Sequence, residues 1–151
     1  MHPPTKTKAE LAFDLGRAMG ELRIYLRQHI QAKIKEHNLD LTFEMLEVMG
    51  CLWRKDGINQ QEIADFTLRD KSSMTYLLDN LAKRKLVTRV EDEDDRRNKL
   101  IYLTAEGRLL KDKLYPWAIE VYEVASADTR TGELEQTIDL LNRMAGNLKK
   151  T

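Results

Sequence analysis

The sequence predicts a mainly α-helical fold with one small β-hairpin, and two observations indicate it. Near both ends of the 151-residue chain, apolar residues recur every three or four positions, which is the period of an amphipathic helix. Between these ends, two short β-branched and aromatic runs flank the charged stretch EDEDDRRNK, which is typical of a two-stranded hairpin. The chain is long enough to bury one hydrophobic core, so we expect a single domain.

The N-terminal part is expected to be a flexible arm followed by a long helix. Residues 1–6 carry two of the three prolines and no helical period, so they form the arm. The helix covers residues 7–37, and its single apolar stripe consists of Leu11, Leu15, Ala18, Leu22, Leu26, Ile30 and Ile34. A stripe this narrow cannot close a core by itself. The helix therefore needs other helices against it, from this chain or from a second subunit.

Two further helices are expected from their capping residues. Thr42 is a suitable N-cap for a helix that ends near Trp53. Asn59 stands three residues before Glu62, which is the spacing of a capping box, and the short helix that follows ends near Phe66.

The next helix is expected to have an apolar face and a polar face. Asp70 caps it, it runs to about Lys85, and its inward residues are Met74, Leu77, Leu78 and Leu81. The short links between these helices are those of a helix-turn-helix. The polar face begins with Lys71, Ser72, Ser73, Thr75 and Tyr76. Small hydroxyl residues near a helix N-terminus can reach phosphates or base edges of DNA. On an isolated helix they would be ordinary surface residues, but the neighbouring elements favour a recognition helix.

A hairpin and two more helices complete the expected fold. The strands are Leu86–Val90 and Leu100–Leu103, and Thr104 caps the helix that follows. After a break at residues 126–132, a terminal helix has an apolar stripe made of Leu134, Ile138, Leu141, Ala145 and Leu148.

Composition narrows the classes of function. The 25 basic and 25 acidic residues balance, so nucleic-acid binding would have to depend on local clusters of cations. No apolar run is long enough for a membrane span and no signal peptide is visible, so we expect a cytoplasmic protein. The three histidines and the single cysteine do not have metal-ligand spacing, and no catalytic or cofactor motif stands out. We therefore expect no metal, no cofactor and no enzyme activity.

The segment from Asn59 to Gly107 resembles the winged helix-turn-helix of the MarR family of transcriptional regulators. The specific motif is Asp95-Arg96-Arg97, followed by a strand and then by Leu-Thr-Ala-Glu-Gly at residues 103–107. The resemblance implies that residues 38–107 form the DNA-binding region and that residues 7–37 and 108–151 form a helical dimerisation region. Lys85 departs from the family, which usually has glycine at this helix end, where the chain makes a left-handed turn.

The resemblance also assigns roles to residues of the hairpin tip. It implies that Asp95 braces the loop and that Arg97 extends into the minor groove, whose negative potential attracts a guanidinium. Arg96 and Lys99 are expected to contact phosphates. Residues 91–94 are interpreted as a solvated acidic run. A further basic patch that could meet phosphates consists of Lys83, Arg84, Lys85 and Arg89.

As a whole, the resemblance predicts a homodimeric repressor that binds a pseudo-palindromic operator of double-stranded DNA and is released by a small aromatic effector. The half-sites would be one helical turn apart, roughly 34 Å. Candidate effector-binding residues are Tyr25, His29, Phe43, Met45 and Trp53, although packing in the core or the dimer interface is the favoured explanation for each of them.

Two alternatives stay open at this stage. The first is a thiol-based redox sensor using Cys51, although its apolar surroundings favour a structural cysteine. The second is a winged-helix module that binds proteins and not DNA, because the fold alone does not determine the function. Such a module would have no need for Arg97 or for the basic patch.

Overall fold

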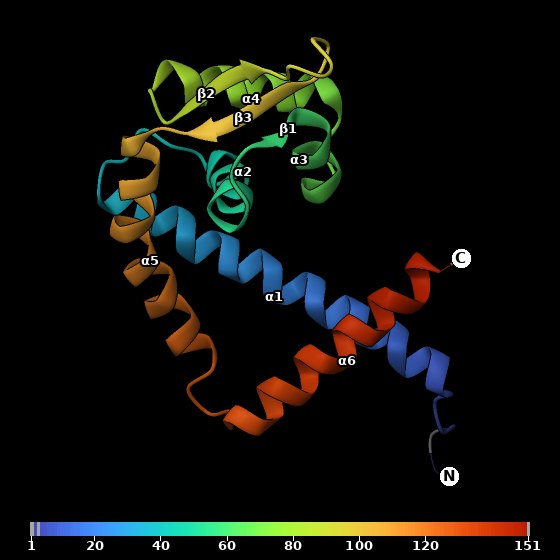
Figure 1. The fold of residues 1–151 in the computed structure, drawn as a ribbon. Helices are drawn as coiled ribbons and strands as arrows, with labels where there is room; N and C mark the ends of the chain where they lie inside the picture. Colours follow the sequence, from blue (N-terminus) through green and yellow to red (C-terminus); the bar gives the residue numbers. More distant parts are fainter. Residues whose placement is uncertain (1, 3, 151) are drawn as a thin grey trace.

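The fold consists of a small winged body from which long helices extend. The computed structural model describes residue 2 and residues 4–150. In chain order the elements are α1 Lys8–Glu36, α2 Phe43–Arg54, β1 Ile58–Asn59, α3 Gln60–Thr67, α4 Lys71–Lys83, β2 Val87–Glu91, β3 Lys99–Leu103, α5 Ala105–Ala125 and α6 Thr131–Lys149. Figure 1 shows α2, α3, α4 and the strands together, whereas α5 and α6 lead away from them. The predicted mainly α-helical fold with a β-hairpin wing is confirmed.

Side-chain caps begin most of the helices, as the sequence predicts. The hydroxyl of Thr42 accepts a hydrogen bond from Met45 N at 3.1 Å, and that of Thr104 accepts one from Gly107 N at 3.0 Å. Asn59 and Glu62 form the expected capping box at the start of α3. These bonds satisfy amide groups that have no partner within the helix, and each contributes about 1 kcal/mol.

The core lies between α2, α3, α4 and the sheet. Met49, Ile63 and Leu78 from three different helices are fully buried in it, together with Ile101 of β3. The four predicted inward residues of α4 are all buried, so that prediction is confirmed. Because the core joins every element of the winged helix-turn-helix, it holds the DNA-binding candidates of α4 and the hairpin in fixed relative positions.

The sheet has three strands in the order β1-β3-β2, all antiparallel. The hairpin β2–β3 is confirmed, with Val87 opposite Leu103 and Glu91 opposite Lys99. The strand β1 was not expected from the sequence, since two residues are too short to show an alternating pattern. It pairs Ile58 with Ile101 and thereby joins the start of α3 to the hairpin.

Two backbone positions make the turn out of α4 possible. The helix ends at Lys83, two residues earlier than expected, and Lys85 takes the left-handed conformation with φ of 60°. The left-handed turn that glycine usually makes at this helix end is thus present, although the residue is lysine. Gly107 lies directly against this turn, because a Cβ at position 107 would collide with the carbonyl oxygen of Leu86. Only glycine permits this close approach of α5 to the hairpin.

The long helices leave apolar residues exposed. Ile34 is the buried residue of α1, and α6 has no buried residue among those described. Phe13 is 70% exposed and Ile138 is 58% exposed. No helix in the described part of the chain has the length and apolar character needed to cross a lipid bilayer.

Candidate nucleic-acid interface and effector pocket

The polar face of α4 is displayed to solvent from its first turn. Lys71, Ser72, Ser73, Thr75 and Tyr76 are all exposed. The helix begins at Asp70, whose carboxylate accepts a hydrogen bond from Ser73 N at 2.7 Å. Hydrogen bonds from the backbone and the side chain of Ser73 lower the pKa of Asp70 below its ordinary value. The cap is therefore ionised at neutral pH, and it fixes the end of the helix that carries the polar residues.

Gln60 of α3 is a further residue of this face that sequence reasoning missed. Its Nε2 donates a hydrogen bond to the Thr75 hydroxyl at 2.7 Å, and that hydroxyl donates to Lys71 O at 3.0 Å. Thr75 is thereby held in one orientation by its neighbours on both helices. The sequence pattern could not indicate this pair, because it depends on how α3 crosses α4.

The tip of the hairpin is a turn built by carboxylates. The Asp95 side chain accepts a hydrogen bond from Arg97 N at 3.0 Å, while its carbonyl accepts one from Asn98 N at 2.9 Å. Asp95 therefore orders the backbone on which Arg97 stands, through hydrogen bonds and not through an ion pair. Arg96 and Arg97 are exposed and make no ion pair with any described residue. The two guanidinium groups remain available for a ligand.

The interpretation of residues 91–94 as a solvated acidic run is wrong for Asp92. Its carboxylate accepts hydrogen bonds from Asp94 N at 3.0 Å and from Asn98 Nδ2 at 3.2 Å. Its own amide donates to Asn98 O at 3.0 Å, so Asp92 closes the base of the turn. The error arose because aspartate side chains in turns bond to nearby backbone amides, whatever the charge of the run.

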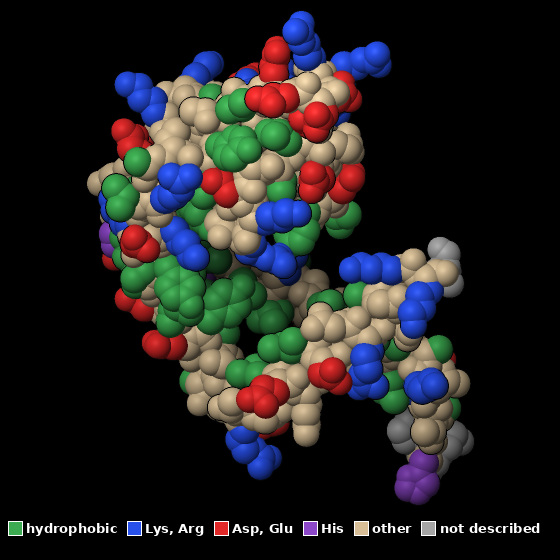
Figure 2. All heavy atoms as spheres, in the orientation of Figure 1, with side chains coloured by type: hydrophobic (Ala, Val, Ile, Leu, Met, Phe, Trp, Pro, Cys, Tyr) green, Lys and Arg blue, Asp and Glu red, His purple; other side chains and the backbone are tan. Residues whose placement is uncertain are grey.

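The helix face and the wing enclose a common hollow of about 500 Å³. Figure 2 shows Lys and Arg side chains projecting from the end of the molecule where Figure 1 places α4 and the hairpin. The residues that line the hollow come from α3, α4, both hairpin strands and the turn between the strands; they are Gln60, Gln61, Ala64, Lys71, Thr75, Asp79, Arg89, Arg97, Asn98 and Lys99. Four of them are cations and one is an anion, so the hollow has a positive balance despite the zero net charge of the chain.

The four basic residues predicted to form a patch at the end of α4 do not lie on one common surface. Arg89 Nη2 binds Asp79 at 2.6 Å inside the hollow, and its side chain is 26% exposed. Arg84 does not line the hollow. Its Nε donates a hydrogen bond to Asp40 O at 2.6 Å, and its Nη2 pairs with the Asp40 carboxylate at 3.1 Å. Lys83 and Lys85 are exposed outside the hollow. Among these four residues, Arg89 alone lies beside the helix face.

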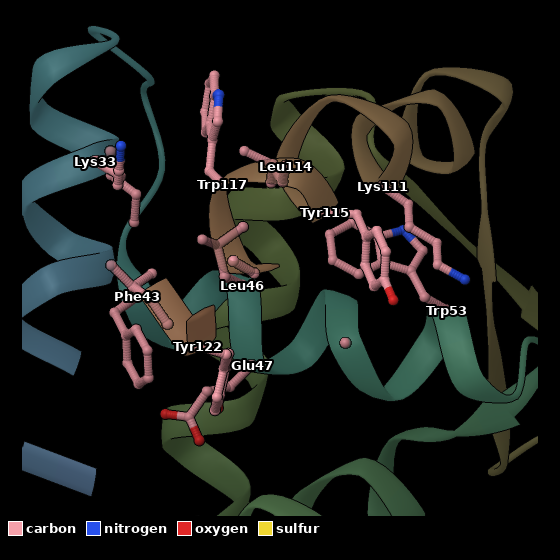
Figure 3. Close-up of a pocket in the computed structure, with 14 residues that line it drawn as sticks. Lys33, Phe43, Leu46, Glu47, Trp53, Lys111, Leu114, Tyr115, Trp117 and Tyr122 are labelled. Carbon is pink, nitrogen blue, oxygen red and sulfur yellow. The ribbon is translucent and has the colours of Figure 1, made fainter. Parts of the chain in front are cut away.

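A second cavity, of about 360 Å³, lies between α1, α2 and α5 and is almost entirely apolar. In Figure 3, Trp53, Tyr115 and Lys111 lie together on one side, while Phe43, Tyr122 and Glu47 lie on another. Trp53 is fixed because its indole Nε1 donates to Gly107 O at 2.9 Å. The lining residues are Ile30, Lys33, Ile34, Phe43, Leu46, Glu47, Gly50, Trp53, Lys111, Leu114, Tyr115, Trp117, Ala118 and Tyr122.

The five effector candidates do not lie together. Phe43 and Trp53 line the cavity, but Met45 belongs to the core, with 4% of its surface exposed. Tyr25 and His29 lie on the exposed surface of α1 and are not part of the cavity lining. The aromatic residues that α5 contributes were missed, since their spacing on the helix was indistinguishable from a packing stripe.

Comparison with known proteins shows which fold and which sequences this chain resembles. The family model described as "MarR family" matches residues 41–99. The regulator MhqR of Bacillus subtilis (strain 168) is 29% identical over 148 residues, which cover 97% of each chain. A MarR transcriptional regulator from Methanosarcina mazei Go1 superposes with a TM-score of 0.78 and 27% identity, over 91% of this chain and 98% of that one. MepR of S. aureus, solved in complex with DNA, has a TM-score of 0.71 and 26% identity over 95% and 99% of the two chains.

The chain is thus similar to MarR family regulators along nearly its whole length, and its winged body matches the family model. The matched segment covers α2, β1, α3, α4, β2 and the first residue of β3. The Asp95–Arg97 turn and the glycine at position 107 both have a structural reason, as described above. The MarR family is one of transcriptional regulators and not of enzymes.

Cys51 is part of the core. It is 6% exposed, and burial raises the pKa of its thiol above the ordinary value, while the nearby Arg54 opposes that effect. The neutral thiol is the unreactive form toward peroxides. The environment therefore favours the structural interpretation of Cys51 over a redox sensor.

Proposed function

We propose that this protein is a sequence-specific double-stranded DNA-binding transcriptional regulator that acts as a homodimer. The observation that carries this proposal is the hollow of positive balance that α4 and the wing share. Its cations Lys71, Arg97 and Lys99 have no carboxylate partner among the described residues. The DNA complex of MepR, a protein of the same fold and of similar sequence, supports it.

Each part of the interface has a separate role. The first turn of α4, with Ser72, Ser73 and Thr75, would enter the major groove, where short hydroxyl side chains allow a close approach to base edges. Arg97 would extend from the turn ordered by Asp95 into the adjacent minor groove. Lys71, Tyr76, Arg89, Arg96 and Lys99 would contact phosphates or support those that do.

The dimer would be formed by residues 7–37 and 108–151. The exposed apolar side chains of α1 and α6 support this role, because an isolated chain would leave Phe13, Leu22 and Ile138 in water. A second copy of the chain would cover them around a two-fold axis. The two α4 helices would then meet successive major grooves of a pseudo-palindromic operator, and occupancy of a promoter would repress it.

The cavity between α1, α2 and α5 would hold the effector that releases DNA. Its aromatic side chains suit a flat apolar molecule. Lys111 lies at its edge beside Trp53 and Tyr115 and has no ion-pair partner within the described residues. We therefore propose an aromatic effector that carries an anionic group. We further propose that the protein binds its ligands without catalysing a reaction. It would act in the cytoplasm, where DNA is accessible.

The direct test is selection of bound fragments from random DNA with the purified protein, followed by affinity measurements on the enriched sequence. An enriched, two-fold symmetric motif bound at least 1,000 times more tightly than random DNA, roughly the lower bound for specific binders, is expected. Binding that does not enrich any sequence would contradict specific regulation. Absence of any DNA binding would favour the winged-helix module that binds proteins.

A further inference from the structure

A single carboxylate in this protein joins three separate parts of the chain. Glu47 Oε1 accepts a hydrogen bond from Arg69 Nη2 at 2.9 Å, and its Oε2 accepts one from Arg23 Nη2 at 2.9 Å. Arg69 lies in the turn between α3 and α4, and Arg23 lies on α1. Glu47 itself is on α2, so this network links the long helix to the helix-turn-helix.

Of the two arginines, Arg69 depends more on its contact with Glu47 than Arg23 does. The Arg69 side chain is 23% exposed, and its Nε is buried with no hydrogen-bond partner among the described residues. Its backbone N–H closes the end of α3 by donating to Ala64 O at 3.0 Å. The next residue is Asp70, the cap of α4. Arg23 is 66% exposed, and an ion pair in that setting contributes little.

Glu47 also lines the cavity between α1, α2 and α5. Gly50, one helical turn further along α2, lines the same cavity, and a Cβ added there would meet no atom within 4 Å. Side chains on a helix lean toward the preceding turn. Any group that fills the space above Gly50 therefore lies against Leu46 and Glu47.

We infer that Glu47 is a positioning residue that couples the cavity to α4. When the cavity is occupied, the occupant acts through Glu47 to change the orientation of α4. An occupant that moves the Glu47 carboxylate weakens its hold on Arg69, and the turn that orients the first residues of α4 then loosens. This inference rests on the proposed function, because the cavity is the proposed effector site and α4 the proposed DNA contact.

Glu44 provides a matched control on the same helix. Its carboxylate pairs with Arg27, which is also on α1, and the Arg27 guanidinium lies 5.1 Å from the centroid of the Phe43 ring. Glu44 makes no hydrogen bond or ion pair to the turn between α3 and α4. Neutralising Glu44 removes one α1–α2 ion pair, as neutralising Glu47 does, but it leaves Arg69 held.

The experiment uses Gly50→Leu as a built-in occupant and needs no added ligand. Amide hydrogen exchange of peptides covering residues 64–73 would be measured by mass spectrometry in the full-length protein. Gly50→Leu is expected to accelerate exchange about tenfold, which is the size of a typical coupling between sites. Glu47→Gln alone should produce a similar acceleration, Glu44→Gln should not, and Gly50→Ala separates the effect of helix propensity from that of filling.

The decisive result is the combination of variants. Gly50→Leu should add nothing further in the Glu47→Gln background, yet should retain its full effect in the Glu44→Gln background. Equal effects in both backgrounds would overturn the inference. If Gly50→Leu does not fold, the comparison of Glu47→Gln with Glu44→Gln still decides, because equal exchange in these two variants would also overturn it.

Operator affinity separates this inference from the proposed function. Gly50→Leu should weaken binding to the selected DNA sequence about tenfold, and only where Glu47 is intact. Absence of DNA binding by the unaltered protein would contradict the proposed function, while the exchange measurement would still test the coupling. Normal DNA binding with additive variants would contradict the coupling alone.

Discussion

The winged body and the terminal helices bury their apolar residues in different ways. In the body, Met49, Ile63 and Leu78 are completely enclosed by residues of the same chain. In α6 no described residue is buried, although its apolar residues have the same helical spacing. Apolar residues therefore recur with the same helical period in both regions, but only those of the body are buried within the chain. The body has the contacts for stability in one chain, whereas α6 leaves its apolar side chains partly exposed, which fits the proposed dimer contact.

The largest expected effect is loss of a core side chain from the body. Leu78→Ala should lower the free energy of unfolding by about 2–5 kcal/mol, because it leaves a cavity between α4 and its neighbours. Urea denaturation at one fixed protein concentration measures this. Ile138→Ala on α6 is the control for the other region. An equal loss in both variants at low concentration would show that the two regions do not differ in the proposed way.

A charged residue on α6 should act on association and not on the body. Ile138→Asp would place a carboxylate in the proposed dimer contact and should weaken the dimer by about 2 kcal/mol, roughly 30-fold in Kd. Analytical ultracentrifugation measures the dissociation constant, and circular dichroism monitors the helices. Glu135→Gln, on the same helix, should leave the dimer unchanged. A dimer as tight in Ile138→Asp as in the unaltered protein would place the interface elsewhere.

Removal of Arg97 should affect DNA binding while leaving both the body and the dimer intact. Arg97→Ala is expected to weaken operator affinity about tenfold and to reduce the salt dependence of binding by about one unit of slope, since one cation is lost. Fluorescence anisotropy at several salt concentrations measures both. Arg143→Ala removes an exposed arginine from α6 and should leave both values unchanged. Unchanged affinity in Arg97→Ala would exclude the wing from the interface.

The smallest expected effect concerns the contact between α1 and α5. Lys33 Nζ donates to Glu120 Oε2 at 2.8 Å, and this hydrogen bond lowers the pKa of Glu120 below its ordinary value. A lowered folded-state pKa means that the stabilisation is present above the ordinary glutamate pKa and disappears as pH falls through the folded-state value. The Tm of the unaltered protein should slightly exceed that of Glu120→Gln at pH 7, with no difference near pH 2. A difference that persists in acid would contradict this assignment.

The local elements of this protein were predictable from its sequence. Each helix cap accepts a hydrogen bond from a backbone amide within three residues, so it can be predicted from the sequence alone. These caps are Thr42, Asn59, Asp70 and Thr104. The inward face of α4 follows from the helical period, whereas the left-handed turn at position 85 was implied only by the family resemblance, in which glycine is usual at this position. The proposed roles of Arg96, Arg97 and Lys99 rest on a family motif and stay predictions.

Tertiary structure decided which of these residues share a site. The pairing of Gln60 with Thr75 and the two-residue strand β1 each depend on elements that meet in space although they are apart in the sequence. The same is true of the effector pocket, where α5 contributes aromatic side chains and Met45 is absent. A sequence pattern records the period of one element, but the angle at which two elements pack is set by the complete core. For that reason the sequence alone determined the helices, the hairpin and the family motif, whereas the hollow, the cavity and the Glu47 network emerged only from the folded chain.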